Sequence, residues 1–187
     1  MISQLLSAPV ARRLVPALLL ITLSATAVHA QSWNPSEAQK DALLSHVTSY
    51  FKALDQEKYS EAYEMLAPPV KANATLSEFR SLRVQAIEAG GRVTSRSLVG
   101  VSWYPGQGME GTALAVAVDY LAETDKEITI CGYLVWLELA EGRYALLRDD
   151  SSSFAREQIE SGLDGMSDEQ KRQVLSPPAC RSLFGRS

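Results

Sequence analysis

The hydrophobic period of the chain changes at Gly90-Gly91, and this change limits the possible folds more than any other feature. Before the glycine pair, apolar residues recur at the spacing of amphipathic helices; after it, they alternate with polar residues, as in strands. A series of helices followed by a series of strands is typical of an α+β domain whose helices cover one face of an antiparallel sheet. The sequence therefore predicts three N-terminal helices packed on a curved four-stranded antiparallel sheet.

Local signals place the three helices. The first begins within residues 34–37, where Asn-Pro-Ser-Glu offers an N-cap, a proline at the first helical position and an acid at the third. A second, short helix over 59–66 is stopped by the Pro-Pro pair at 68–69. Thr75 and Glu78 form the capping box of a third helix, which ends at the glycine pair.

Four runs after the glycine pair have the pattern of strands. They cover residues 93–103, 112–121, 127–139 and 143–149. The third is apolar on both faces, which predicts a central strand that is covered on both sides. Asp149-Asp150 stands where the fourth strand is expected to end, and the sequence favours a loop position for this acidic pair, because strand neighbours point to opposite faces.

The first thirty residues have the three-part form of a secretory signal. Arg12 and Arg13 precede an apolar run from Leu14 to Leu23, which is too short for a bilayer span, and small residues lead to Ala30. We expect cleavage after Ala30 and a periplasmic or secreted product with no stable membrane anchor. The alternative is an uncleaved anchor, which the polar residues directly behind the apolar run disfavour.

Export changes the interpretation of the two cysteines. Cys131 lies in an apolar segment and Cys180 lies near the C-terminus. An oxidising compartment favours a disulfide between them, which stabilises the fold by roughly 4 kcal/mol in the chain-entropy model. The sequence thus predicts a signal peptide at 1–30, a domain at 31–153 and a C-terminal helical extension at 154–187 tethered by this bridge. The extension is either a solvated segment or a lid that covers one end of the sheet.

Charge and motifs exclude several function classes. Lysine and arginine total 18 against 22 acidic residues, so the net charge of −4 gives no reason to expect nucleic acid as a partner. The sequence has no phosphate loop, no dinucleotide-binding glycine set and no metal-ligand spacing, so we expect no cofactor and no metal. His46 is the only histidine after Ala30, and its helical setting favours a helix-flank role over catalysis.

Three segments resemble a known superfamily. Residues 50–55 (Tyr-Phe-Lys-Ala-Leu-Asp) and 59–63 (Tyr-Ser-Glu-Ala-Tyr) look like the opening of nuclear-transport-factor-2-like domains, which have a cystatin-like, cone-shaped α+β fold. Residues 91–98 (Gly-Arg-Val-Thr-Ser-Arg-Ser-Leu) are similar to a family of small secreted bacterial proteins known only as a domain of unknown function. The resemblance covers about 37–153. It implies dimerisation through the sheet and an apolar pocket between sheet and helices, but the fold serves enzymes and binding proteins alike.

Few residues offer chemistry. Asp119 is the best candidate for a general base, since a carboxylate on a strand of Ala, Val and Leu can have its pKa raised by burial. A pairing with Arg96 or Arg148 across the sheet, or a solvated strand end, is the more frequent role of such a residue. In the enzyme alternative, these arginines hold a substrate carboxylate and Tyr104, Tyr133 or Tyr144 orients a substrate oxygen.

Aromatic residues of the strands could line a ligand pocket. The candidates are Trp103, Tyr133 and Trp136, with Arg96 beside them; plain core or a dimer face is the alternative role. Together these observations favour an exported, non-enzymatic binding or interaction module of the bacterial cell envelope. Its expected partners are a small apolar ligand, an envelope protein or a second copy. The alternative is a small cone-fold enzyme of the isomerase, cyclase or dehydratase type that uses Asp119 as base on a small apolar substrate.

Overall fold

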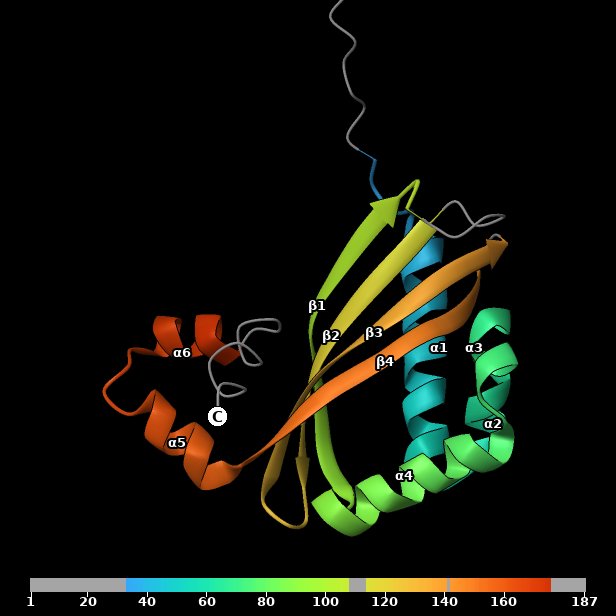
Figure 1. Cartoon of the computed structure of the whole chain (residues 1–187). Helices are drawn as coiled ribbons and strands as arrows, with labels where there is room; N and C mark the ends of the chain where they lie inside the picture. Colours follow the sequence, from blue (N-terminus) through green and yellow to red (C-terminus); the bar gives the residue numbers. More distant parts are fainter. Residues whose placement is uncertain (1–32, 108–113, 141, 176–187) are drawn as a thin grey trace, which may run out of the picture. The chain divides into compact units, whose positions relative to one another are not determined.

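The protein has an α+β fold in which four helices precede a four-stranded antiparallel sheet (Figure 1). The computed structural model describes residues 33–107, 114–140 and 142–175. The predicted signal peptide, Cys180 and its predicted disulfide therefore lie wholly or partly outside the described residues. The elements are α1 (Glu37–Asp55), α2 (Tyr59–Glu64), α3 (Pro68–Asn73), α4 (Leu76–Gly90), β1 (Val93–Pro105), β2 (Leu114–Thr124), β3 (Ile128–Ala140), β4 (Arg143–Ala155), α5 (Arg156–Leu163) and α6 (Asp168–Leu175).

Helix α1 begins two residues later than its proline signal suggested. Ser36, not Asn34, is the N-cap, and its hydroxyl accepts from the Gln39 amide while the Gln39 side chain accepts from the Ser36 amide. This reciprocal pair satisfies two N–H groups that the first turn leaves open. The apolar face of α1 is buried against the sheet through Leu43, Val47, Tyr50, Phe51 and Ala53.

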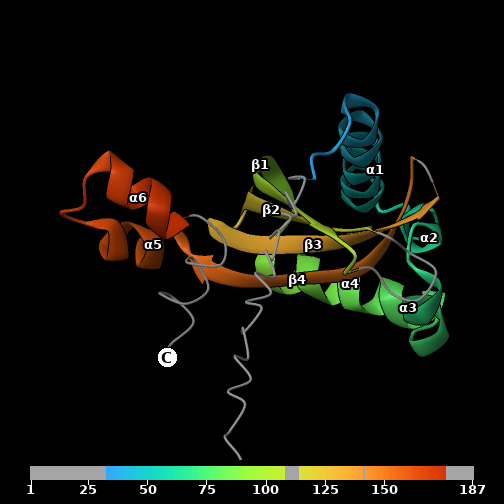
Figure 2. The ribbon, with the colours of Figure 1, turned by 90° about the horizontal axis from the view of Figure 1, so that it is seen from above.

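The prediction of three helices before the sheet was wrong, because Pro68-Pro69 opens a helix of its own. Both prolines occupy the first helical turn of α3, where a missing N–H needs no partner. Just before them, Leu66 forms a parallel bridge with Leu146 of β4, and the Ala67 amide donates to the Leu146 carbonyl at 2.8 Å. Figures 1 and 2 show α2 and α3 side by side next to β4.

Helix α4 is capped as predicted by Thr75 and Glu78 and ends at Gly91. Gly91 has a φ of +88°, and a Cβ at this position would collide with the side chains of Asp125 and Lys126. Only glycine combines this backbone conformation with so close a contact. The turn at Gly91 sends the chain directly into β1 and so brings the end of α4 beside the sheet.

The sheet has the order β1-β2-β3-β4, with every neighbouring pair antiparallel. We call the face that contacts α1 the inner face; from β2 it carries Val116, Val118 and Tyr120, all of which belong to the main core. Side chains alternate along a strand, so Asp119 and Leu121 point to the opposite, outer face.

Two strands depart from the predicted pattern. In β1, an irregularity between Leu98 and Gly100 inserts Val99, so the expected single alternation along the strand was wrong. Strand β4 continues to Ala155, so Asp149 and Asp150 lie within a strand and not in the predicted loop. The predicted domain boundary at residue 153 consequently falls inside β4. The prediction of a central β3 is confirmed, since β3 pairs on both sides.

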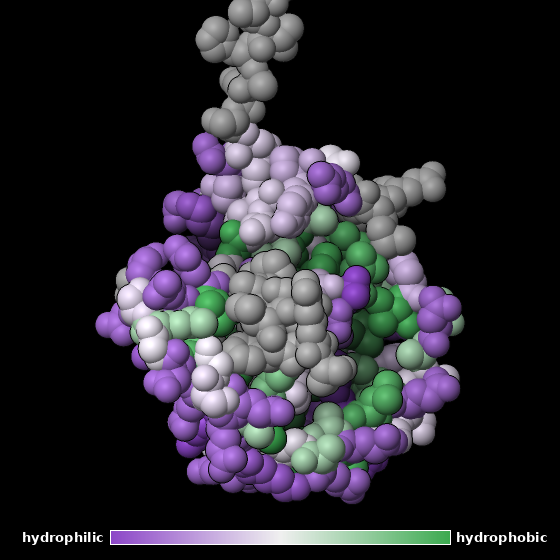
Figure 3. All heavy atoms as spheres, turned by 60° about the vertical axis from the view of Figure 1, so that its left-hand side comes forward, coloured by the Kyte–Doolittle hydropathy of each residue, from purple (hydrophilic) through white to green (hydrophobic). Residues whose placement is uncertain are grey.

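The outer face is covered at one end by α5. Ile159 of α5 forms a small buried cluster with Phe154 and Cys131, and Cys131 has no exposed surface and is not a free thiol. On β1, by contrast, Val99 and Tyr104 are exposed, with 42% and 41% of their surface accessible to solvent. Figure 3 turns the left-hand side of Figure 1 forward and shows hydrophobic residues in green on this side, with hydrophilic residues in purple at the rim.

Candidate functional site

A cavity of about 460 Å³ lies between α4, the end of α1 and the inner face of the sheet. Its size is in the range of roughly 300–1,000 Å³ that is typical of small-molecule sites. Aliphatic groups form much of its wall, namely Leu54, Ala86, Ile87, Ala89, Val93, Ala122, Ile128 and Ile130. The polar side chains of the wall are Asp55, Tyr59, Arg83, Arg92, Arg96, Tyr120, Asp149, Ser151 and Ser153.

Asp149 is the buried anchor of this wall. Its side chain is 8% exposed, and Oδ2 accepts from Arg83 Nη2 at 2.8 Å and from the Tyr50 hydroxyl at 2.9 Å. Arg83 Nη2 also lies 3.0 Å from the Tyr50 oxygen. A buried carboxylate is tolerated only when it is paired and hydrogen-bonded, and Asp149 meets both conditions. The group ties α1, α4 and β4 together.

The protonation states at this anchor follow from burial and charge. Burial is the largest cause that raises the pKa of Tyr50 well above 10, and the negative charge of Asp149 raises it further. The pKa of Tyr120 is raised in the same way, first by burial and then by Asp149. Burial is the largest single influence on Arg83 and lowers its pKa, but the charge of and hydrogen bond to Asp149, together with Tyr50 and Tyr120, outweigh it and the net shift is upward. At neutral pH both phenols are therefore protonated and the guanidinium is charged.

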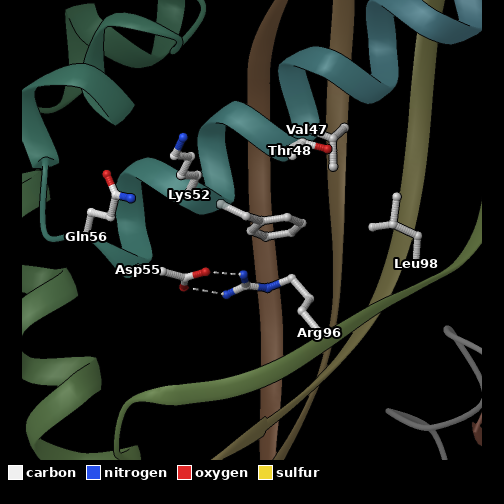
Figure 4. Close-up of a pocket in the computed structure, with 8 residues that line it drawn as sticks. Val47, Thr48, Lys52, Asp55, Gln56, Arg96 and Leu98 are labelled. Atoms are coloured by element: carbon white, nitrogen blue, oxygen red, sulfur yellow. Dashed lines mark hydrogen bonds and ion pairs between the residues drawn. The ribbon is translucent and has the colours of Figure 1, made fainter.

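Arg96 lies between this cavity and a smaller one. Its Nη1 and Nη2 donate to the two oxygens of Asp55 at 2.8 and 3.1 Å, and its guanidinium lies 4.0 Å from the centre of the Phe51 ring. Figure 4 shows this pair beside the smaller cavity of about 310 Å³ between α1 and β1. Phe51, Asp55 and Arg96 line both cavities and so form the partition between the two. Arg96 Nε is buried without a hydrogen-bond partner.

Tyr59 supplies a second unpaired group. It is 6% exposed, it lines the larger cavity from the start of α2, and its hydroxyl is buried without a hydrogen-bond partner. Burial is the main cause that raises the pKa of Tyr59, so its hydroxyl is protonated at neutral pH. Two residues of the wall, Arg96 and Tyr59, thus each have a buried donor that no described side chain or backbone group uses.

The sequence predicted only one of the residues that line the larger cavity. Arg96 is in the wall, whereas Trp103 packs at the edge of the main core and contacts the Trp33 ring at 5.9 Å. Trp136 has no exposed surface and packs edge-on against Tyr50, so it is core. Tyr133 lies on the outer face, where its hydroxyl donates to Asp150 at 3.3 Å.

Asp119 also lies away from the cavity. It pairs with Tyr133 in the β2–β3 ladder and with Gly100 in the β1–β2 ladder, so its side chain is on the outer face. It is not among the residues of the cavity wall. The other residues considered for substrate orientation lie elsewhere too: Tyr104 is exposed on β1, the Tyr144 hydroxyl donates to the Gln39 carbonyl, and Arg148 pairs with Asp150.

Sequence reasoning missed Asp149, Arg83 and Tyr59. An extended fourth strand would have placed Asp149 on one face of the sheet, but the acidic pair suggested a strand end. Arg83 is one polar position on an amphipathic helix, and nothing in its spacing marks it as buried. Tyr59 was considered only as the first residue of the second helix and of the segment 59–63 that carries the family resemblance.

His46 contacts its own helix and two aromatic rings. Its Nδ1 lies 2.8 Å from the Ala42 carbonyl, and its ring packs edge-on against Tyr144 and Trp136. Within residues 33–175, apart from the undescribed positions, no cluster of three or more His, Cys, Asp or Glu side chains could hold a metal ion. No helix of the described ranges is long and apolar enough to cross a membrane.

No family model matches the chain, and no curated protein matches it.

Proposed function

We propose that the mature protein is an exported, non-enzymatic binding module of the bacterial cell envelope that holds a small, largely apolar molecule. The observation that carries the proposal is the cavity of about 460 Å³, whose aliphatic wall is interrupted by a few fixed polar groups. This combination is typical of ligand sites, because apolar area supplies affinity and a few polar groups set orientation. The ion pairs Arg83–Asp149 and Arg96–Asp55 hold the wall in place without a ligand.

We also propose that the fold is the cone-shaped, nuclear-transport-factor-2-like variant of the α+β class. Helices that precede a four-stranded antiparallel sheet, with a cavity between sheet and helices, support this assignment. Dimerisation through the sheet is part of the same proposal, and the exposed side chains of Val99 and Tyr104 on β1 favour it.

The enzyme alternative with Asp119 as base has less support. A general base must lie within hydrogen-bond reach of the proton that it removes, and Asp119 lies on the face of the sheet opposite to the larger cavity. Asp149 is a carboxylate within the wall, but Oδ2 already accepts from Arg83 and Tyr50. We therefore assign Asp149 to the support of the cavity.

Binding can be tested with the neutral, apolar fluorophore N-phenyl-1-naphthylamine. Ile87→Trp places a larger side chain in the wall, while Leu82→Trp is its matched control on the exposed side of α4, where Leu82 is 64% exposed. We expect the wild type and Leu82→Trp to bind the fluorophore equally, and Ile87→Trp to bind it about tenfold more weakly or worse. Equal binding by all three proteins would contradict the proposal.

Export needs a separate test. Expression of the full chain followed by N-terminal sequencing of the extracytoplasmic fraction is expected to give a protein that begins at Gln31. A product that retains Met1 would contradict cleavage. Native mass spectrometry of the same sample reports the oligomeric state and any small molecule that co-purifies.

A further inference from the structure

The charged side chains in the wall of the larger cavity all have a partner of opposite charge within the protein. The wall contains three arginines and two aspartates. Their ion pairs are Arg83–Asp149, Arg96–Asp55 and Arg92–Glu57. Three guanidinium groups therefore face three carboxylates, and the wall with its partners has no net charge.

Two of these pairs are shielded from water to a large extent. In the Arg83–Asp149 pair, the side chains are 28% and 8% exposed, and in the Arg96–Asp55 pair they are 14% and 41% exposed. Figure 4 shows Asp55 of α1 and Arg96 of β1 pointing toward each other, with both oxygens of the carboxylate engaged. Groups that satisfy each other in this way have little charge left to attract an ionised ligand.

An ionised head group would consequently enter the cavity at a high cost in free energy. An ion that leaves water needs a partner of opposite charge and hydrogen bonds to replace its hydration. The wall already uses each of its charges internally, so it offers such a partner neither to a carboxylate nor to an ammonium group. An uncharged head group needs only hydrogen bonds.

Two serines of β4 can supply hydrogen bonds without charge. Ser151 pairs with Gly132, which pairs with Tyr120 on the inner face, and side chains alternate along a strand, so Ser151 and Ser153 both point to this face. Both serines are exposed and line the larger cavity. A hydroxyl can donate and accept. The aliphatic wall begins beside them, since Ser153 pairs with Ile130 in the β3–β4 ladder.

We propose that the larger cavity selects an uncharged aliphatic molecule with one hydrogen-bonding group, such as a fatty alcohol, and that Asp55 and Asp149 determine this selectivity. The inference rests on the proposed binding function and adds the class of ligand. The polar group of the ligand hydrogen-bonds to Ser151 or Ser153, and its chain lies against aliphatic side chains such as Ile130. Each aspartate excludes anions because it occupies an arginine that would otherwise bind them.

Three probes with the same ten-carbon chain vary only the head group: decanol, decanoate and decylamine, all below their aggregation concentrations. At pH 7 the carboxyl group is ionised and the amine is protonated. We expect decanol to displace N-phenyl-1-naphthylamine from the wild type at least tenfold more effectively than either ion. Equal displacement by decanol and either ion would overturn the inference. Decanol also leaves water more readily than the ions do, so variants of the ion pairs provide the deciding comparison.

Two substitutions release opposite charges at one site. Asp55→Asn keeps the shape of the side chain but leaves Arg96 without its carboxylate, and we expect decanoate affinity to rise about tenfold while decanol affinity stays within twofold. Arg96→Met leaves Asp55 without its cation, and we expect decylamine affinity to rise. The second gain should be smaller, about threefold, because Asp55 is more exposed to water than Arg96. A general loosening of the cavity cannot produce these opposite shifts.

Glu64→Gln is the matched control for Asp55→Asn. It changes the net charge of the chain by the same amount, but Glu64 pairs with Lys71 and is not among the residues of the cavity wall. We expect this variant to keep the selectivity of the wild type. An equal gain in decanoate affinity in Glu64→Gln and Asp55→Asn would mean that overall charge, and not the wall, decides, which would overturn the inference.

Thermal unfolding shows whether each variant is folded, and decanoate should raise the Tm of Asp55→Asn more than that of the wild type. Asp149→Asn is the second variant, since it releases Arg83 in the same wall, and we expect the same direction of change. Wild-type selectivity in both asparagine variants would overturn the inference. If the fluorophore binds and Ile87→Trp weakens it, that result excludes charge selection alone. If fluorophore binding does not depend on Ile87, the binding function itself is contradicted.

Discussion

The ring of Tyr120 lies directly over Gly132, its partner in the β2–β3 ladder. A Cβ added to Gly132 would fall inside the contact distance of Tyr120 Cζ, Cε1 and the hydroxyl oxygen. The absence of a side chain at Gly132 therefore lets the phenol lie across the inner face of the sheet. In this position the Tyr120 hydroxyl lies 3.5 Å from Asp149 Oδ1 and the ring forms part of the cavity wall.

We predict that Gly132→Ala destabilises the protein by about 1–3 kcal/mol, the usual cost of overpacking a core. The added methyl group must displace the Tyr120 ring, which is 6% exposed and packs against Phe51 with 4.9 Å between ring centres. Urea denaturation measures the change in the free energy of unfolding.

Gly100→Ala is the matched control, since Gly100 is also within a strand but its added Cβ would be 3.5 Å from Asp119 Oδ2, an ordinary contact. We expect this variant to be no less stable than the wild type, because alanine loses less backbone entropy on folding than glycine. Equal destabilisation by the two substitutions would show that Tyr120 is not held over Gly132.

The Arg83–Asp149 pair predicts an asymmetric response to mutation. Arg83→Met leaves a carboxylate that is 8% exposed without its cation, and we expect a loss of about 3 kcal/mol or more. Asp149→Asn leaves an arginine that is 28% exposed and can be hydrated in part, so we expect a smaller loss. Denaturation of both single variants and the double variant gives the coupling energy, which we expect to be about 0.5–3 kcal/mol. A coupling energy of zero would contradict the assignment of Asp149 as anchor.

The helices were largely predictable from the sequence because their signals are local. The capping box of Thr75 with Glu78 and the stop at Gly91 each depend on residues within one turn, and both are present. Local rules were misleading at Pro68-Pro69, because proline both ends one helix and begins the next. The deciding contact there is the pairing of Leu66 and Ala67 with Leu146 of β4, which no local pattern reveals.

The cavity was less predictable because tertiary contacts create it. The period of two in β1 is interrupted at Val99, so a simple alternation cannot assign the faces of that strand. Arg96 was identified as a pocket residue, but its partner Asp55 is at the far end of α1 and could not be paired with it from spacing. Asp149 was dismissed as a loop residue, although β4 continues for six residues beyond it to Ala155.

Stability is predicted to fall at alkaline pH as the buried tyrosines ionise in the unfolded chain. Burial, followed by the charge of Glu138, raises the pKa of Tyr144 from 10.0 to about 12. Below pH 10 this tyrosine is protonated in both states and has no effect on the pH dependence. Between pH 10 and 12 the unfolded chain releases the proton first, so the free energy of unfolding decreases as pH rises.

Tyr144→Phe should reduce this decrease between pH 10 and 12, because phenylalanine has no proton to release. Urea denaturation at pH 9, 10, 11 and 12 measures the slope, and tyrosinate absorbance follows ionisation in the folded protein. The same slope in Tyr144→Phe and wild type would mean that this phenol ionises alike in both states.

The C-terminal extension gives the last prediction. Cys131 is fully buried on the outer face beside Phe154 and Ile159, and it is not a free thiol. Cys180 is the only other cysteine of the chain. We predict that the exported protein has an intact mass about two units lower before reduction than after it, as a single bridge requires.

Cys180→Ser should then lower the free energy of unfolding by up to about 4 kcal/mol, the chain-entropy value for a loop of this length. The loss should disappear when wild type and variant are compared under reducing conditions, because neither then has a bridge. Alkylation of two thiols in the denatured, non-reduced wild type would contradict the disulfide, and the extension would then be held by noncovalent contacts such as the packing of Ile159 near Cys131 and the ion pair of Arg156 with Glu123.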